Sequence, residues 1–392
     1  MATIKYKEAS PYSKPIPRPP AEDYLYKNYE SDFRCSNDGS NEKIIGIALF
    51  GVGRAGTIHL SNIIGSKRVK LLYIVDDIEE KWSKIKNHFC LNDVTFLTSK
   101  QSDKVFQDKA VDAVVVASPT YTHEKIVLKS LDAKKAVFCE KPVAEDRADT
   151  EKCFEAARKS GKPLFTAFNR RFDPSYSTVR DEVRQGKIGH AQVVKTVSRD
   201  SPIPTIDYLK NSGGIFHDCM VHDIDLLTWL IGELPSKVSV QAAANIPEIK
   251  AIDDFDTVAV TMQFPSGTLG IIDLSRNSCY GYDMRLEAFG PKGVVRAENE
   301  QPIHCVETMY KYNGPNHSPI WYSFPSRFKL AYMREFDHFI DIVLGKSICS
   351  VEAKEVLAVS KIATACEESA RSGKMITLNW TTDEIPNNHL AQ

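Results

Sequence analysis

The feature that most constrains the fold is an alternation of short apolar runs with helical stretches between residues 43 and 167. The runs include "IIGIALF", "LLYIV" and "AVVVA", which are rich in β-branched residues. Helical stretches of roughly ten to fifteen residues separate them, a pattern typical of a parallel sheet covered by helices on both faces. This part of the chain is therefore predicted to be a doubly wound α/β domain.

The pattern changes beyond about residue 167. The segment "TVAVTMQF" alternates polar and apolar residues, and "PSG" at 265–267 and "GPKG" at 290–293 supply turns. Alternation over segments joined by turns predicts a large, mainly antiparallel open sheet with one buried face. Apolar stripes then predict two helices, one that stops at Gly345 and one that runs from near Ser350 to Gly373. The second part is expected to be α+β.

The chain, with 392 residues, is long enough for two domains. Five prolines between Pro11 and Pro20 favour an extended arm at the N-terminus. We predict this arm over residues 1–42, the doubly wound domain over 43–166, the α+β domain over 167–378 and a C-terminal tail over 379–392.

Composition excludes several classes of function. Fifty basic and 51 acidic residues give a net charge of −1, and no run of Lys and Arg indicates nucleic-acid binding. The nine cysteines are scattered without a C-x-x-C pair, so neither a disulfide framework nor a zinc cluster is indicated. The longest apolar runs are far too short to span a bilayer. We expect a cytoplasmic protein with neither nucleic acid nor membrane as a partner.

A glycine-rich turn follows the first apolar run. In "IALFGVGRAGTIH", Gly51, Gly53 and Gly56 keep the G-x-G-x-x-G spacing between a strand and a helix. The first glycine allows a tight turn, the second lets the backbone approach a pyrophosphate, and the third lets helix and strand pack. Asp76 ends the second run, where a carboxylate accepts ribose hydroxyls and repels a 2′-phosphate. We predict NAD as the cofactor, with NADP disfavoured; a plain glycine turn with a solvated aspartate is the alternative.

Two further loops are predicted at the same edge of the sheet. The fourth run ends in "ASPTYTH", and the fifth ends in "CEKP". Ligands bind at the carboxyl ends of the strands in such folds, so Lys141 is expected beside the nicotinamide, where the alternative is a solvated loop charge. His123 is as well suited to capping the following helix as to contacting a ligand. The predicted cofactor-binding residues are Gly51, Gly53, Arg54, Ala55, Gly56, Asp76, Ser118, Pro119, Thr120, His123, Glu140 and Lys141.

The segment "GGIFHDCMVHDID" places acidic and imidazole side chains in an apolar stretch. On an α-helix, at about 100° per residue, Asp218, His222 and Asp225 share an arc of about 60°. His217 and Asp223 point elsewhere. Because apolar residues surround that arc, its polar side chains need partners or a function.

Three interpretations of this face compete. A metal site would lack further ligands, so no metal is predicted. A structural hydrogen bond between Asp218 and His222 is the second. Acid–base chemistry is the third and is favoured, because a dehydrogenase needs an imidazole that titrates near neutrality. His222 would take the proton of an alcohol, Lys141 would hold its oxygen, and Asp218 would orient His222 or bind a neighbouring hydroxyl.

Six motifs together resemble a known family. They are "GVGRAG", "SPTYTH", "CEKP", "FNRRFDPSY", "GGIFHDCMVHDIDLLTWLIG" and "CYGYDMRLEAFGPKG". Their order is similar to that of the Gfo/Idh/MocA oxidoreductases and, within them, the inositol 2-dehydrogenases. The similarity covers roughly residues 43–378.

The resemblance implies a Rossmann domain followed by an α+β domain that binds substrate and whose open sheet builds homodimers or homotetramers. It implies NAD-dependent oxidation of a secondary hydroxyl of inositol or a sugar, with Lys141, Asp218 and His222 as the catalytic set. It also places Asn169, Arg170 and Tyr282 at the substrate. Relatives that act on an aldose or a trans-dihydrodiol leave those substrates open. A non-catalytic sensor of NAD(H) is the alternative from another class.

Overall fold

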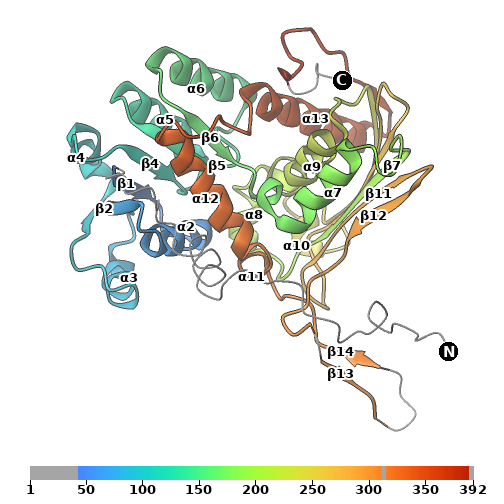
Figure 1. The fold of residues 1–392 in the computed structure, drawn as a ribbon, viewed down its shortest axis with the longest axis horizontal. Helices are drawn as coiled ribbons and strands as arrows, with labels where there is room; N and C mark the ends of the chain where they lie inside the picture. The colour runs from blue at the N-terminus through green and yellow to red at the C-terminus, as the bar shows by residue number, and fades with distance from the viewer. Residues whose placement is uncertain (1–42, 305, 311–314, 388–392) are drawn as a thin grey trace, which may run out of the picture.

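The computed structural model describes residues 43–387 apart from residue 305 and residues 311–314 (Figure 1). The predicted arm over residues 1–42 and the end of the predicted tail, residues 388–392, lie outside the described residues. In the described part of the chain, no helix combines the length and the apolarity that crossing a bilayer requires.

The first sheet has six parallel strands in the order β3-β2-β1-β4-β5-β6, as the alternating pattern predicts. Its central strands β1 and β4 are buried at every position, because helices cover both faces. The strands are β1 (Ile45–Phe50), β2 (Val69–Val75), β3 (Thr95–Leu97), β4 (Ala113–Val116), β5 (Ala136–Glu140) and β6 (Leu164–Ala167). The helices around it are α2 (Arg54–Gly65), α3 (Trp82–His88), α4 (Asp103–Gln107), α5 (His123–Asp132) and α6 (Arg147–Ser160).

The second sheet has seven strands in the order β12-β11-β7-β10-β9-β8-β15. Only its β7–β10 pair is parallel, so the prediction of a mainly antiparallel sheet is confirmed. Along β9, residues alternate between buried and exposed because one face packs on helices α7, α9 and α13 (Figure 1). The strands are β7 (Val193–Arg199), β8 (Lys237–Ala243), β9 (Thr257–Gln263), β10 (Leu269–Ser275), β11 (Asp283–Gly290), β12 (Gly293–Ala297) and β15 (Ile376–Thr377).

Helix α12 (Lys329–Val343) returns from the second part of the chain and packs on the first (Figure 1). Phe336, Phe339 and Ile340 are buried on its apolar stripe, and the Phe339 ring lies 5.5 Å from that of Phe138 in β5. The other helices are α7 (Pro174–Arg184), α8 (Ile206–Leu209), α9 (Val221–Ile231), α10 (Pro247–Lys250), α11 (Phe324–Arg327) and α13 (Ala353–Ser372). Short turns η1 (Glu79–Lys81), η2 (Ser99–Gln101), η3 (Thr120–Thr122) and η4 (Asn169–Phe172) and the hairpin β13 (Glu307–Thr308) and β14 (Asn316–His317) complete the described chain.

One local prediction is wrong: "GGIFHDCMVHDID" does not form one continuous α-helix. Residues Ile215–Cys219 form a π-helix, η5, in which the Met220 amide donates to the Ile215 carbonyl at 2.9 Å, and α9 begins only at Val221. A π-turn holds one more residue than an α-turn, so the even angular step assumed for Asp218, His222 and Asp225 does not apply.

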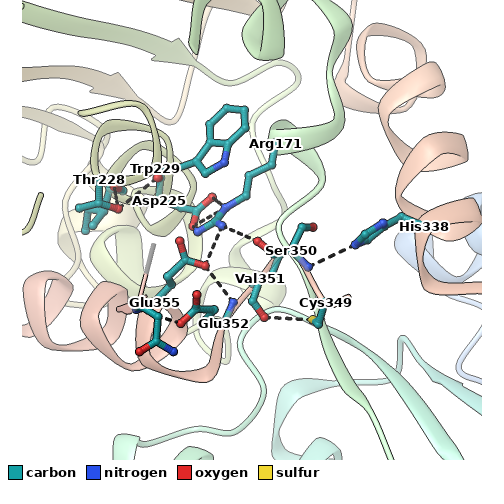
Figure 2. Close-up of polar contacts among 12 residues, drawn as sticks. Arg171, Asp225, Thr228, Trp229, His338, Cys349, Ser350, Val351, Glu352 and Glu355 are labelled. Atoms are coloured by element: carbon teal, nitrogen blue, oxygen red, sulfur yellow. Dashed lines mark hydrogen bonds and ion pairs between the residues drawn. The ribbon is translucent and has the colours of Figure 1, made fainter. Parts of the chain in front are cut away.

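Asp225 consequently belongs to a closed cluster away from Asp218. Figure 2 shows Arg171 between Asp225 and Glu355. The Arg171 guanidinium donates to Asp225 Oδ1 at 2.6 Å, to Glu355 Oε2 at 2.9 Å and to the Ser350 carbonyl at 3.1 Å. This cluster ties η4, α9 and the start of α13 together.

Candidate active site

A cavity of about 770 Å³ lies at the carboxyl edge of the parallel sheet and is lined by both parts of the chain. Loops after β1, β4 and β5 line one side, and η5, α9 and residues that follow β10 line the other. This is the edge at which doubly wound sheets bind ligands.

The glycine turn leaves its backbone open toward this cavity. Gly51 has φ +85°, and a Cβ there would lie 2.6 Å from the Ser118 Cα, whereas a Cβ on Gly53 would meet nothing within 4 Å. Gly53 is the N-cap of α2, and no side chain caps that end. Free amides at a helix start with open backbone around them fit a pyrophosphate.

Gly56, predicted as part of the cofactor site, does not line the cavity. A Cβ on it would lie 2.0 Å from the Gly51 carbonyl oxygen, so this position lets α2 approach the turn. Asp76 lines the cavity at the end of β2, and its carboxylate accepts the Val52 and Ile78 amides, each at 2.9 Å. The other predicted cofactor residues that line the cavity are Gly51, Gly53, Arg54, Ala55, Ser118, Pro119, Thr120, His123, Glu140 and Lys141.

His123 joins two of the cavity loops. Its ring nitrogens lie 2.8 Å from the carbonyl oxygens of Ser118 and Pro142, and its side chain is buried. Burial lowers the pKa of His123. Because both nitrogens face main-chain oxygens, this histidine holds the loops after β4 and β5 together, as well as starting α5.

Glu140 stands between the cavity and a buried histidine. One oxygen lies 2.7 Å from His59 Nε2, and the other accepts the Lys141 amide at 3.3 Å. Burial opposes ionisation of Glu140, but the hydrogen bond from His59 keeps the pKa of this carboxyl below its ordinary value. The next peptide bond, Lys141–Pro142, is cis.

Lys141 contacts Asp218 from across the cavity. Its Nζ donates to Asp218 Oδ1 at 3.1 Å and to the Asp218 carbonyl at 2.6 Å. Arg276 donates to Asp218 Oδ2 at 2.8 Å, and the Tyr208 hydroxyl donates to Oδ1 at 2.9 Å. Although burial opposes it, the charges of Lys141 and Arg276 hold the pKa of Asp218 well below its ordinary value. A carboxylate from η5 is therefore shared between two cations.

His222 lines the same cavity, and in the described chain Asp218 is hydrogen-bonded to groups other than this imidazole. Both Asp218 oxygens are taken by other groups, and within the described chain His222 Nδ1 is buried without a hydrogen-bond partner. Burial, followed by the charges of Lys141 and Arg170, lowers the pKa of His222 well below its ordinary value. The lowered pKa of His222 favours the neutral imidazole.

The three residues predicted at the substrate, Asn169, Arg170 and Tyr282, all line the cavity. The Arg170 side chain is held by partners: its Nη1 donates to Asp223 Oδ1 at 3.1 Å and to Ser198 Oγ at 3.0 Å. It borders the cavity as a fixed, paired cation. Asn169 and Tyr282 are buried beside it.

Several cavity residues escaped the sequence analysis. Arg276 directly follows β10, and a charge at the end of an apolar run was its one sequence signal. Others come from loops and helices whose position depends on the tertiary fold; they include Asp200, Tyr208, Phe324, Phe328 and Tyr332. Among the residues that the structure describes, no group of three or more His, Cys, Asp or Glu side chains is arranged to hold a metal ion.

Two family models match the chain. Residues 45–168 match the model described as "Oxidoreductase family, NAD-binding Rossmann fold", and residues 176–296 match the model described as "GFO/IDH/MocA C-terminal domain". The matches fall on the parallel sheet and on the second sheet, respectively.

Similar proteins span the same two parts of the chain. A myo-inositol 2-dehydrogenase from Thermotoga maritima is 35% identical over 84% of this chain and 98% of its own length. An inositol 2-dehydrogenase from Rhizobium meliloti is 33% identical over 84% of this chain and 98% of its own. A solved scyllo-inositol dehydrogenase from Lactobacillus casei, with bound NAD(H) and scyllo-inositol, superposes with a TM-score of 0.78 at 28% identity, covering 86% of this chain and 99% of that one.

Proposed function

We propose, from the premise that this chain belongs to the Gfo/Idh/MocA oxidoreductase family, that it oxidises a secondary hydroxyl of a cyclic polyol of the inositol class. The observation that carries the proposal is that Lys141, Asp218 and His222 line one cavity together with the glycine turn. The relatives named as inositol dehydrogenases support a polyol substrate.

The residues at the cavity fit NAD. The amides at the start of α2 suit the pyrophosphate, and Asp76 with the adjacent Asp77 disfavours the 2′-phosphate of NADP. When bound, the nicotinamide supplies the acceptor for the hydride.

The protein's own residues supply the acid–base chemistry. A secondary alcohol becomes a good hydride donor as its O–H proton leaves, and the neutral imidazole of His222 accepts that proton. The Lys141 ammonium has three donors, of which the carboxylate and the carbonyl of Asp218 take two. Its third donor stabilises the developing alkoxide.

We also propose that the open face of the second sheet forms an interface with a second copy of the chain. Leu269, Val193, Phe289 and Val294 pair across β10, β7, β11 and β12, so they form one row on one face. Leu269, Phe289 and Val294 are each more than two-fifths exposed. Contiguous exposed apolar residues favour an interface, and Phe289→Asp should reduce the oligomer mass measured by light scattering.

NADH formation measured by absorbance across a panel of inositols, aldoses and trans-dihydrodiols, with NAD and NADP in parallel, tests the function. We expect turnover with an inositol and NAD. Turnover restricted to an aldose or a dihydrodiol would redirect the substrate assignment. Binding of NAD without turnover of any member would instead support an NAD(H) sensor.

A further inference from the structure

We propose that Arg276 is a positioning residue, which fixes the π-helix η5 and thereby holds Asp218 and the Lys141 ammonium in place; this inference rests on the proposed function. Arg276 follows β10, far in the sequence from both partners. Its side chain is 1% exposed, although it lines the cavity. An arginine so completely buried needs anionic partners from the surrounding elements.

Arg276 lies near two carboxylates. One belongs to Asp218 within η5, and the other, Asp254, is hydrogen-bonded to the first residue of η5. Its Nη1 donates to Asp218 Oδ2 at 2.8 Å, and its Nη2 lies 3.8 Å from Asp254 Oδ2. Asp254 Oδ1 accepts the amide of Ile215, the first residue of η5, at 3.0 Å. Arg276 thus hydrogen-bonds to Asp218 near the end of the π-helix and forms a longer ion pair with Asp254, which holds its start; in the described chain Arg276 Nη2 and Asp254 Oδ2 have no hydrogen-bond partner.

The backbone before η5 lies close to Asp254. Gly214 has φ +77°, and a Cβ on it would lie 3.2 Å from Asp254 Oδ1. The chain therefore passes closely over the carboxylate that receives the first amide of η5. Such π-turns occur frequently at functional sites, where the added residue redirects a side chain.

This arrangement divides the two oxygens of Asp218 between its partners. Oδ2 accepts from Arg276, which leaves Oδ1 for Lys141 and Tyr208. Without Arg276, Oδ2 would lose its hydrogen bond and the carboxylate could rotate. The Lys141 ammonium would then lose its defined position at the alcohol oxygen, and small misplacements of a reacting group cost up to about 10²-fold in rate.

Arg171 provides a matched control within the same chain. Its side chain is 2% exposed and also bridges two carboxylates, Asp225 and Glu355. None of these three residues lines the cavity. Arg171→Lys and Arg276→Lys therefore disturb equally buried ion pairs, of which one borders the proposed reaction site.

The test measures kcat, KM, NAD affinity and melting temperature for wild type, Arg276→Lys, Arg276→Met and Arg171→Lys, with a polyol that the wild type oxidises. We expect Arg276→Met to lower kcat about 10- to 100-fold while NAD affinity changes less than about twofold, with partial recovery in Arg276→Lys. Arg171→Lys should lower the melting temperature but retain kcat. Wild-type kcat in Arg276→Met would overturn the inference.

A double-mutant cycle separates positioning from a general loss of stability. If Arg276 acts through Asp218, adding Arg276→Met to Asp218→Asn should change kcat less than about threefold. If the two substitutions instead lower kcat in the double variant by the product of their single effects, Arg276 does not act through Asp218.

Hydrogen exchange at amides 215–222 needs no turnover and distinguishes the two proposals. Arg276→Lys should accelerate exchange there, whereas Arg171→Lys should not. Accelerated exchange in a protein whose wild type oxidises no polyol would overturn the proposed function alone. Unchanged exchange would overturn the assignment of Arg276, whatever the activity.

Discussion

Two buried ion clusters each take a carboxylate from residues 218–225, and they differ in what they border. Asp218 in η5 is shared by Lys141 and Arg276 at the cavity. Asp225 in α9 and Glu355 share Arg171 in a closed part of the fold (Figure 2). Both clusters are buried and hydrogen-bonded, so burial and pairing alone do not mark a functional site. We propose that the position at the cavity is what distinguishes the Asp218 cluster.

The clusters also differ in charge. In the cavity cluster two cations, Lys141 and Arg276, share the Asp218 carboxylate, and Arg276 also lies near Asp254; in the closed cluster one cation, Arg171, is shared by two carboxylates. The Lys141 ammonium borders the cavity, where a cation can stabilise an alkoxide, whereas none of the closed cluster's three residues lines the cavity. We therefore propose a role in chemistry for the first cluster and a role in stability for the second, and variants can separate the two.

Removing the cavity ammonium should have the largest effect. Lys141→Met is expected to lower kcat by about 10²- to 10⁴-fold, because the alkoxide loses its charged partner. The melting temperature should stay close to that of the wild type, since Asp218 keeps Arg276 and Tyr208 as donors. Steady-state NADH formation and a thermal scan measure both. A variant with full kcat would remove Lys141 from the mechanism.

Breaking the closed cluster should show the opposite result. Arg171→Met leaves two buried carboxylates without their common cation, which should lower the free energy of unfolding by about 3–5 kcal/mol. Activity per folded molecule should remain. Urea unfolding measures the loss, and Arg158→Met serves as the control because the Arg158–Glu155 pair lies on the surface. Equal losses in both variants would refute a stabilising role for the cluster.

Another buried acid sharpens the comparison, because no cation of the described chain forms an ion pair with it. Glu335 in α12 is fully buried, and neither of its oxygens has a hydrogen-bond partner within the described chain. Burial, followed by the charges of Glu140 and Asp225, raises its pKa well above the ordinary value near 4.5. The folded state therefore keeps a proton that the unfolded state loses above that value.

The free energy of unfolding should consequently fall as the pH rises above about 4.5, by up to about 1.4 kcal/mol per pH unit for this one proton. Glu335→Gln, which keeps the shape without the titration, should remove this contribution. Unfolding at pH 5 and pH 8 measures the slope, and exposed Glu368→Gln is the control. A slope that Glu335→Gln leaves unchanged would show that this carboxyl ionises in the folded protein.

The smallest expected effect concerns the pH dependence of the cavity. Because the pKa of His222 lies well below 6.5, the imidazole remains a proton acceptor as the pH falls through neutrality. The acidic limb of kcat/KM that belongs to His222 should therefore lie below pH 6.5. The limb should be absent in a His222→Asn variant with measurable residual rate. A limb at or above pH 6.5 would contradict a neutral resting imidazole.

Much of the framework was predictable because it depends on local pattern. Alternating strands and helices, the turn at Gly51 and the stops at Gly345 and Gly373 are short-range features, and the structure contains them. The same patterns place Lys141 after β5, at the edge where parallel strands end. His222 also reaches this cavity, although the angular argument for it assumed a regular α-helix.

What the sequence by itself determined is the class of fold, the glycine turn and part of the cavity lining, Lys141, Asp218 and His222 included. Only the tertiary structure decided which partners those residues have: Asp218 pairs with Lys141 and Arg276 instead of His222, and Arg170 pairs with Asp223. The physical reason is the separation along the chain over which each kind of interaction acts. Periodicity reports neighbours within a few turns, whereas a π-turn fixed by Asp254 and Arg276 and a carboxylate shared between domains depend on contacts that form only when distant elements pack.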